Sequence, residues 1–491
     1  MNAMPPNATA TDLIASTIAA FNARTALSKQ HASDARNVLA DKSSMAMMFT
    51  PALKEAFYPI TAARAEGAYL EDIDGNRYVD ILMGLGCNLL GHNPPVIREA
   101  LERRIARGFP IGPQSDIATE TAELFCTLTR QDRVAFSNTG TEAVMHAVRI
   151  ARTATGRRKI AIFTNAYHGH SDLAWHKAKR REYFRRGALQ RTQSGPLKML
   201  RPLLQRMMIT GAQPGIAGIP DAQVRDILVL DYGNPRALDI LRRKANQLAA
   251  ILVEPVQSRV PELQPRDFLH DLRGIADSSG VALIFDEMIT GFRVAQGGAQ
   301  EHFDVQADLA TYGKIAGGGL PLSIIAGRNR FMDHIDGGPW KFGDNSVPQV
   351  ETTLFAGTYC RHPLALTAAR EMAQYLIQAG PALQNDLNAQ TKGLIERLND
   401  GCAKANLPLR YTCFGSFFAI ANSQSRITAE AVNLLSLMLL NKGVHLRAGD
   451  RGGFLSTANS AADIDLVATA LLDSLSELAD HGLITRSEGA A

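Results

Sequence analysis

Short, uninterrupted apolar runs alternate with helical stretches along much of this 491-residue chain. Such runs occupy residues 160–163, within a strand predicted at 159–163, and residues 227–230, 248–253 and 281–285. A strand that is buried on both faces is apolar throughout, and strands separated by helices usually pair in parallel. We therefore expect an α/β fold in which helices cover both faces of a large, mostly parallel sheet.

Polar clusters follow three of these runs within a few residues. Asp286 and Glu287 come after residues 281–285, Glu254-Pro255-Val256-Gln257 follows residues 248–253, and Tyr167-His168-Gly169-His170 follows residues 159–163. Open α/β sheets bind ligands at the carboxyl ends of their strands. The three clusters are therefore expected to meet around one site.

Lys314 stands among small residues and is followed closely by Gly317-Gly318-Gly319. A lysine before a glycine-rich turn can be an ordinary surface side chain. Pyridoxal phosphate chemistry, however, requires a lysine that forms a Schiff base and an acid that keeps the pyridinium nitrogen protonated. Lys314 and Asp286 are the candidates for these two functions.

A helix is expected to begin at Asn138-Thr139-Gly140-Thr141-Glu142-Ala143, directly after a predicted strand at residues 133–137. Free backbone N–H groups, hydroxyls and the helix dipole at such a turn favour an anion. The simpler alternative is that Thr139 or Thr141 only caps the helix. In combination with Lys314, the pattern favours a phosphate site.

Tyr167, His168 and His170 could be metal ligands at a strand end, but no third ligand follows at a useful spacing. We expect instead that Tyr167 stacks on a flat cofactor, with His168 as a neighbour.

The length of the chain indicates more than one lobe. We expect an N-terminal arm at residues 1–55, part of a small domain at 56–95, a large cofactor-binding domain at 96–380 and the rest of the small domain at 381–491. A β-hairpin is predicted around Asp74-Gly75-Asn76, and Met83 to His92 is predicted to be a loop.

The composition is that of an ordinary globular enzyme, with 46% hydrophobic and 20% charged residues. No segment approaches the roughly 20 apolar residues that span a bilayer. The first residues do not have the pattern of a signal peptide, and the five cysteines are scattered. A cytoplasmic protein is expected.

Residues 176–206 contain ten Lys or Arg and a single acid, Glu182. Such a segment can be a solvated helical insertion. The alternative is that residues 177–206 bind an acidic partner, such as an acyl carrier protein.

Taken together, these motifs resemble the class III, fold-type I pyridoxal-phosphate aminotransferases, the family that includes glutamate-1-semialdehyde aminomutase. The resemblance covers residues 57–478 and is carried by the segments 137–143, 167–169, 254–257, 285–287, Lys314 and 357–358. Residues 254–265, 336–340 and 454–458 also resemble the aminotransferase domains of hybrid polyketide–peptide synthetases.

The resemblance implies a role for each matching residue. Lys314 would form the Schiff base and move the α-proton, Asp286 would pair with the pyridinium nitrogen, and Tyr167 and Met288 would lie on opposite faces of the ring. The other implied cofactor contacts are Thr139, Gly140 and Thr141 at the phosphate, His168 and Glu254 beside the ring, Gln257 at its phenolic oxygen, and Thr358 at the phosphate of the neighbouring subunit. A homodimer with shared sites follows from the last of these.

One expected residue is missing. Many relatives bind the donor carboxylate through an arginine near the C-terminal lobe, where this chain has Gly453-Phe454-Leu455-Ser456-Thr457. Arg259, Arg447 or Arg451 could substitute, although each could equally be a surface charge. The departure favours a long or tethered carbonyl acceptor over a small keto acid.

The resemblance thus implies a transaminase that transfers an amino group from an amino acid to a ketone or aldehyde. We expect the acceptor to be a β-keto or aldehyde acyl chain, or a polyketide-derived chain, of specialised metabolism. The alternatives are an aminomutase, a racemase or decarboxylase on the same scaffold, and a binding protein without activity.

Overall fold

The computed structural model describes residues 8–41, 47, 49–181, 184, 185, 188, 199 and 210–487. The chain forms two compact units. Unit 1 contains Met1–Arg103, Val260–Glu262 and Ala379–Ala491, and unit 2 contains Arg104–Arg259 and Leu263–Gln378.

Unit 2 is built on a sheet of seven strands among the described residues, in the order β4-β12-β11-β10-β9-β5-β8. Only β12 runs against its neighbours, β4 and β11; the other pairs in the sheet are parallel. The strands are β4 (Arg133–Ser137), β5 (Lys159–Phe163), β8 (Ile227–Leu230), β9 (Leu248–Val253), β10 (Ala282–Asp286), β11 (Leu309–Tyr312) and β12 (Ser323–Gly327). The expected large, mostly parallel sheet is confirmed.

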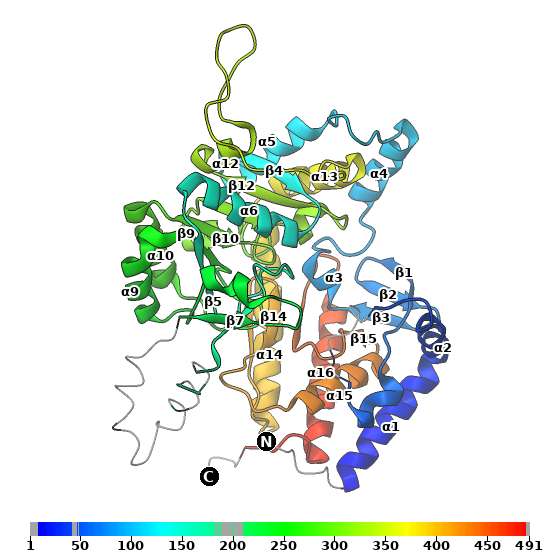
Figure 1. Cartoon of the computed structure of the whole chain (residues 1–491). Helices are drawn as coiled ribbons and strands as arrows, with labels where there is room; N and C mark the ends of the chain where they lie inside the picture. The colour runs from blue at the N-terminus through cyan, green and yellow to red at the C-terminus, as the bar shows by residue number, and fades with distance from the viewer. Residues whose placement is uncertain are drawn as a thin grey trace. The chain divides into compact units, whose positions relative to one another are not determined.

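Helices pack around this sheet, and Figure 1 shows α6, α9 and α10 among them. The helices of unit 2 are α5 (Ala118–Thr129), α6 (Gly140–Thr155), α9 (Pro235–Lys244), α10 (Arg266–Ser279), α11 (Gly298–Phe303), α12 (Asn329–Asp336) and α13 (Pro363–Ala379). Short 3-10 turns occur at Asp221–Asp226, Ala245–Gln247 and Lys314–Gly317, and a small hairpin joins β6 (His176–Ala178) to β7 (Ala212–Pro214).

Alternate strand residues form the core with α6. Ile160, Ala250, Leu252 and Ile284 belong to the same buried cluster as the α6 residues. The intervening residues of β9 and β10 are fully buried as well. Because successive side chains in a strand point to opposite faces, both faces of the sheet are covered.

Unit 1 contains a four-stranded sheet in the order β1-β2-β3-β15 and a three-stranded sheet in the order β13-β14-β16. Its strands are β1 (Ala62–Glu66), β2 (Tyr69–Asp72), β3 (Arg77–Asp80), β13 (Tyr411–Phe414), β14 (Phe417–Ile420), β15 (Val444–His445) and β16 (Gly452–Phe454). Its helices are α1 (Ala8–Arg24), α2 (Ala26–Ala35), α3 (Met83–Gly86), α4 (Pro95–Arg107, whose last residues fall in unit 2), α14 (Ala382–Lys404), α15 (Ala429–Asn441) and α16 (Ala461–Asp480), with a 3-10 turn at Pro51–Ala56.

The predicted hairpin forms, since β2 and β3 pair antiparallel around the turn at Asp74-Gly75-Asn76. The prediction of a plain loop from Met83 to His92 is wrong at its start. Met83–Gly86 is a helical turn in which Gly84 and Leu85 have left-handed backbone angles. Leu85 is therefore held in a conformation that is uncommon for a residue with a side chain.

Two further observations concern the described part of the chain. None of its helices is both long enough and apolar enough to span a membrane. Its five cysteines are all free thiols.

Candidate active site

The predicted site residues lie in loops at one edge of the unit 2 sheet. β4, β5, β9, β10 and β11 all run in the same direction, so their carboxyl ends share this edge. Parallel pairing thus brings together loops that are separated by up to about 180 residues along the chain.

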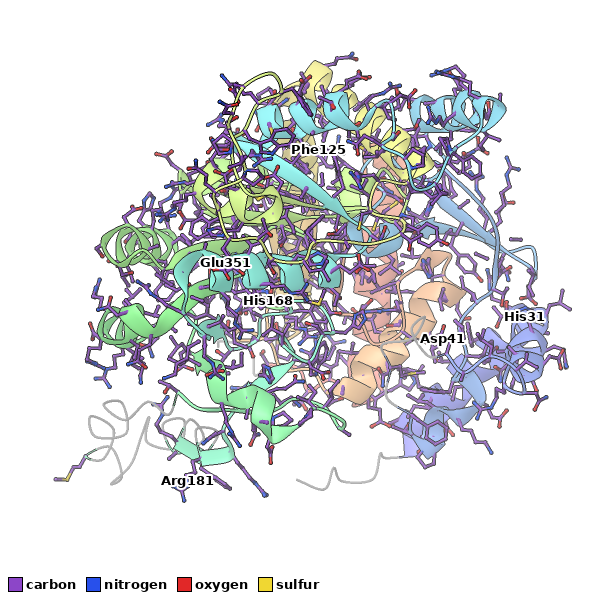
Figure 2. The ribbon with its side chains drawn as sticks, turned by 45° about the horizontal axis from the view of Figure 1, so that its top comes forward. His31, Asp41, Phe125, His168, Arg181 and Glu351 are labelled. Atoms are coloured by element: carbon purple, nitrogen blue, oxygen red, sulfur yellow. The ribbon has the colours of Figure 1, made fainter. Side chains whose placement is uncertain are left out.

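A buried pair, His168 and Asp286, occupies the centre of this edge. His168 Nδ1 lies 2.8 Å from Asp286 Oδ2, and the two residues are only 2% and 3% exposed. Asp286 Oδ1 accepts the backbone N–H of Met288 at 3.2 Å. His168 is labelled in Figure 2.

A second buried carboxylate, Glu254, connects two of the loops. Its Oε2 accepts the backbone N–H of Tyr167 at 3.0 Å, and its Oε1 accepts that of Ser258 at 2.9 Å. Burial raises the pKa of Glu254, and the nearby charge of Asp286 raises it further, whereas His168 acts in the opposite direction. Glu254 therefore holds Tyr167 in place through its backbone.

Two buried polar atoms at this edge have no hydrogen-bond partner among the described residues: Gln257 Oε1 and His168 Nε2. The amide nitrogen of Gln257 donates to Thr164 O at 2.8 Å, which fixes the position of the side chain. A buried polar atom without a partner is costly, so such atoms commonly mark the place of a bound polar group.

Helix α6 begins at the end of β4 with its capping groups in place. Thr139 Oγ1 accepts the backbone N–H of Glu142 at 3.2 Å, and the Glu142 carboxylate accepts the backbone N–H of Asn138 at 2.9 Å. The capping role considered for Thr139 is therefore observed. The first backbone N–H groups of the helix, at Gly140 and Thr141, have no intrahelical acceptor and can bind an anion.

The loop after β5 packs against this helix start. The backbone N–H of His170 donates to Thr141 Oγ1 at 3.3 Å, and His170 Nδ1 lies 3.1 Å from the same oxygen. A Cβ at Gly169 would lie 2.6 Å from Thr141 Oγ1, so a side chain there would separate the two loops. His168 and His170 thus contact different partners, which does not favour the metal site considered for them.

Met288 lies between two glycines. A Cβ at Gly140 would approach its sulfur to 2.8 Å, and a Cβ at Gly313 to 2.7 Å. The absence of side chains at these two positions leaves space for Met288 between the start of α6 and the loop that carries Lys314.

Lys314 begins a 3-10 turn directly after Gly313, and its φ is +50°. Few residues other than glycine adopt this left-handed conformation, and such strain concentrates at functional sites. Thr311, three residues earlier, pairs with Asp286 in the β10–β11 register. The half-buried Lys314 therefore follows the strand next to the one that ends at Asp286.

Glu287 turns away from its neighbour Asp286. Its carboxylate accepts the Thr290 hydroxyl at 2.7 Å and the backbone N–H groups of Ala299 and Gln300 at 2.8 and 2.9 Å. Burial raises its pKa to about 7. Of the two adjacent acids, only Asp286 contacts His168, while Glu287 holds the start of α11.

Thr358 is exposed and lies in an irregular segment near the end of β4. Two residues away, Cys360 Sγ accepts a long hydrogen bond of 3.9 Å from Asn138 Nδ2. The segment is therefore adjacent to the start of α6, although Thr358 itself faces solvent.

The three candidate arginines differ in their contacts. Arg447 donates two hydrogen bonds to Asp450, at 2.9 and 3.0 Å, and Arg451 donates one to Asn422 at 2.6 Å, all within unit 1. The guanidinium carbon of Arg259 lies 5.5 Å from the centre of the Tyr167 ring. Only Arg259 is placed by these contacts beside a predicted cofactor residue.

Most of the basic segment at 177–206 falls outside the described residues. Lys177, Lys179, Arg180 and Arg181 are described and exposed, and Arg181 lies at the periphery in Figure 2. Arg185 does not fit the expectation of an exposed docking surface, because it is 7% exposed and its Nη2 lies 3.3 Å from Asp231.

Two contributors to this edge were not predicted from the sequence. Thr311 Oγ1 lies 3.5 Å from Asp286 Oδ1, and Trp175 packs edge-on against Tyr167 with ring centres 5.3 Å apart. For Thr311 a signal existed, since it lies in the strand that leads into Lys314. Nothing in the sequence distinguishes Trp175 from a core residue.

The arrangement suits a flat, phosphorylated, basic ring. An anion can bind at the start of α6, a protonated ring nitrogen can face a buried acid, and the two partnerless polar atoms offer further contacts. Tyr167, 41% exposed, presents an aromatic surface beside them. A strained lysine completes a set of residues able to hold an aldehyde cofactor covalently.

Comparison with known proteins gives three kinds of match. A family model described as "Aminotransferase class-III" matches residues 51–452. The chain is 33% identical over 427 residues, 84% of this chain and 90% of the relative, to a glutamate-1-semialdehyde 2,1-aminomutase of Alkaliphilus oremlandii. Its fold is similar to that of an omega-transaminase from Sphaerobacter thermophilus, with a TM-score of 0.75, 27% identity and coverage of 92% and 97% of the two chains.

A further solved structure is a β-phenylalanine aminotransferase from Variovorax paradoxus. It has a TM-score of 0.77 and 25% identity, and the match covers 98% of this chain and all of that one.

Proposed function

The chain belongs to the class III aminotransferases, the fold-type I enzymes that depend on pyridoxal 5'-phosphate, and from this premise we propose that it aminates a ketone or aldehyde with an amino acid as donor. The observation that carries the proposal is the buried His168–Asp286 pair at the sheet edge that also holds the start of α6 and the loop of Lys314.

We propose that different residues at this edge bind different parts of the cofactor. Asp286, in contact with His168, would face the ring nitrogen. Gly140 and Thr141 would bind the phosphate through the start of α6, where Thr139 caps the helix. When bound, pyridoxal phosphate supplies an electron sink for the carbanion left by removal of the donor's α-proton.

The ring and its substituents have candidate contacts of their own. Tyr167 and Met288 would pack against opposite faces of the ring, and Gln257 Oε1, which has no partner among the described residues, would be available to a ring substituent. Glu254 holds Tyr167 through its backbone. Lys314 Nζ would hold the aldehyde group of the cofactor, and the same amine would act as the base that moves the α-proton of the donor.

The decisive experiment replaces Lys314 with alanine. Purified wild-type enzyme should carry the visible absorbance of the covalently bound cofactor, and Lys314→Ala should lose both that absorbance and turnover. Lys341→Ala, which removes an exposed lysine elsewhere in unit 2, is the matched control and should behave as wild type. Turnover by Lys314→Ala would refute the assignment.

For the acceptor we propose a β-keto or aldehyde acyl chain, or a polyketide-derived chain, of specialised metabolism. The support is the absence of an arginine from Gly453-Phe454-Leu455-Ser456-Thr457, together with the segments that resemble synthetase-embedded aminotransferase domains. A screen of free and carrier-bound acyl thioesters against small keto acids tests this. Preference for a small keto acid would contradict it.

We also propose a homodimer in which Thr358 serves the neighbouring subunit. The support is its exposure on a segment that carries two exposed apolar side chains, Leu354 (73%) and Tyr359 (58%). Neither Lys314→Ala nor Thr358→Ala should be fully active alone. Mixed subunits should regain activity if sites are shared, and no gain would contradict sharing.

Docking of an acyl carrier protein at residues 177–206 is proposed on the exposed Lys177, Lys179, Arg180 and Arg181. Reversing the charge of Arg180 and Arg181 should raise KM for carrier-bound substrate alone. An equal effect on free thioesters would contradict docking.

An aminomutase is the second candidate, because the relative from Alkaliphilus oremlandii bears that name. A transaminase releases the keto acid of its donor, whereas an aminomutase moves the amine within one substrate. Detection of a released keto acid therefore separates the two.

A further inference from the structure

His170 lies beside the start of α6, where the phosphate of the cofactor is proposed to bind. Its backbone N–H donates to Thr141 Oγ1 at 3.3 Å, and its Nδ1 lies 3.1 Å from the same oxygen. The main chain and the ring of one residue therefore contact a single hydroxyl, which belongs to the second residue of the helix. The position of the ring relative to this hydroxyl is fixed at two points.

Gly169 allows the loop to come this close. Its φ is +84°, and a Cβ at this position would lie 2.6 Å from Thr141 Oγ1 and 2.9 Å from Thr141 Cα. Because the Cα belongs to the helix backbone, it cannot turn aside as a side chain could. The preceding residue, His168, is bonded to Asp286 at 2.8 Å. The loop after β5 is thus held by His168 at the buried acid and by His170 at the helix start.

The Thr141 hydroxyl can be used in two ways. A hydroxyl has one proton and can accept two hydrogen bonds, and the backbone N–H of His170 takes one of the acceptor positions. If His170 Nδ1 accepts the hydroxyl proton, none is left for an anion at the helix start. If Nδ1 carries a proton, it donates to the second acceptor position of Thr141 Oγ1, and the hydroxyl proton can point to an anion. Either nitrogen of an imidazole can carry the proton.

An anion at the helix start favours the second arrangement. The first backbone N–H groups of α6 and the helix dipole attract negative charge there. A hydrogen bond from a hydroxyl to a charged phosphate oxygen is stronger than one to a neutral ring nitrogen. The neighbouring acid, Glu142, is directed toward Asn138, whose backbone N–H and side-chain amide its Oε2 accepts at 2.9 and 3.2 Å.

We propose that His170 is a positioning residue of the phosphate site: its Nδ1–H donates to Thr141 Oγ1 and so directs the Thr141 hydroxyl proton to a phosphate oxygen of the cofactor. The inference rests on the proposed function, which places the phosphate at Gly140 and Thr141, and adds the residue that sets the direction of the hydroxyl. His170 itself does not need to touch the cofactor. Its effect should therefore depend on the phosphate and on Thr141.

The test compares two aldehydes that differ in the phosphate. Pyridoxal 5'-phosphate and pyridoxal can both bind Lys314, so a change between variants in the ratio of their dissociation constants isolates the contribution of the phosphate. Each is titrated into full-length apoenzyme and followed by its visible absorbance. The variants are His170→Ala, His170→Asn, whose amide nitrogen can take the place of Nδ1–H, and His31→Ala. His31 is the matched control, since it is an exposed histidine of unit 1 whose Nδ1 lies 3.5 Å from the Thr61 hydroxyl.

His170→Ala should raise the dissociation constant of pyridoxal 5'-phosphate about 3- to 10-fold, the size of one net hydrogen bond, and change that of pyridoxal by less than about twofold. His170→Asn and His31→Ala should bind both aldehydes within about twofold of wild type. Because His170 is exposed, its substitution removes no buried packing, and the midpoint of unfolding in urea should stay that of wild type.

A double-variant cycle shows whether Thr141 transmits the effect. Thr141→Val removes the hydroxyl and should weaken binding of pyridoxal 5'-phosphate about 10- to 150-fold, the range for a hydrogen bond to a charged group. If His170 acts through this hydroxyl, adding His170→Ala to Thr141→Val should cost less than about a further twofold. A further loss as large as that in the wild-type background would assign His170 a direct contact with the cofactor and overturn the proposal.

A spectroscopic measurement needs no turnover. In holoenzyme that contains isotopically labelled histidine nitrogen, the NMR resonance of His170 Nδ1, assigned by its loss in His170→Asn, should be that of a protonated nitrogen. An unprotonated Nδ1 would show that the ring accepts the hydroxyl proton, which would overturn the proposal.

Failure of this inference can be told apart from failure of the proposed function. In His170→Ala, a loss of less than about threefold for pyridoxal 5'-phosphate, or an equal loss for pyridoxal, would overturn the role of His170 and leave the cofactor assignment intact. Wild-type affinity in Thr141→Val, or a wild-type protein that binds neither aldehyde, would refute the proposed function on which the inference rests.

Discussion

Replacement of Glu254 with glutamine tests how the loops of the site are held together. The glutamate accepts two backbone N–H groups, one per oxygen, from Tyr167 and Ser258. In Glu254→Gln one oxygen becomes an NH2 group, so either orientation of the amide places two donors face to face. One buried N–H then loses its acceptor, at a cost of about 1–3 kcal/mol.

This cost should appear in two measurements. The free energy of unfolding in urea should fall by that amount, since the site is buried. The concentration of pyridoxal phosphate needed for half-saturation should rise, because the loop that carries Tyr167 is no longer held. The visible absorbance of the cofactor, titrated into apoenzyme, measures this directly.

Glu351→Gln is the matched control. Glu351 is an exposed residue of unit 2, labelled in Figure 2, and a surface substitution of this kind usually changes stability by less than about 0.5 kcal/mol. If Glu254→Gln were as stable as Glu351→Gln and bound the cofactor equally well, the two hydrogen bonds would not hold the loops, and the reasoning would be refuted.

Two further predictions concern neighbouring residues. Because the folded-state pKa of Glu287 is raised to about 7, wild type should lose roughly 3 kcal/mol of stability relative to Glu287→Gln as pH rises from about 4.5 to above 7. Unfolding in urea at several pH values measures this, and parallel curves would contradict it. Gly313→Ala should displace the Met288 sulfur and weaken cofactor binding about tenfold, as expected for roughly 1–2 kcal/mol of overpacking. In a Met288→Ala background the same glycine substitution should cause no further loss of cofactor binding, and a further tenfold loss there would show that Met288 is not the cause.

The sequence predicted the parallel strands well. The strands at 227–230 and 248–253 occur within the predicted residues, and 281–285 is displaced by one residue from β10. These strands are buried on both faces, so their apolar runs are continuous and easily recognised. β12 was not anticipated: it follows Lys314 and its glycines closely, and its position between β4 and β11 depends on antiparallel pairing.

For the candidate site as well, some residues could be proposed from a local sequence signal, whereas the contacts between them could not. Lys314, Asp286 and the start of α6 could be proposed from the sequence because each carries a local signal: a lysine before glycines, an acid at a strand end, and small hydroxyl residues before a helix. The bond between His168 and Asp286 joins residues 118 positions apart, and no local pattern predicts it. The different roles of Asp286 and Glu287 were equally hidden, since adjacent residues in an extended chain point in opposite directions and their partners belong to other elements.

The chain by itself thus determined its family, its cofactor and the residue types that the chemistry requires, because these depend on composition and spacing along the backbone. Only the tertiary structure decided which groups meet. It placed Arg259 over the Tyr167 ring, paired Arg447 with Asp450 and directed Glu287 toward α11. It also left Gln257 Oε1 without a partner among the residues that the structure describes. Contacts of this kind depend on the packing of strands and loops that are distant in sequence, and burial then sets the cost of every polar group left unsatisfied.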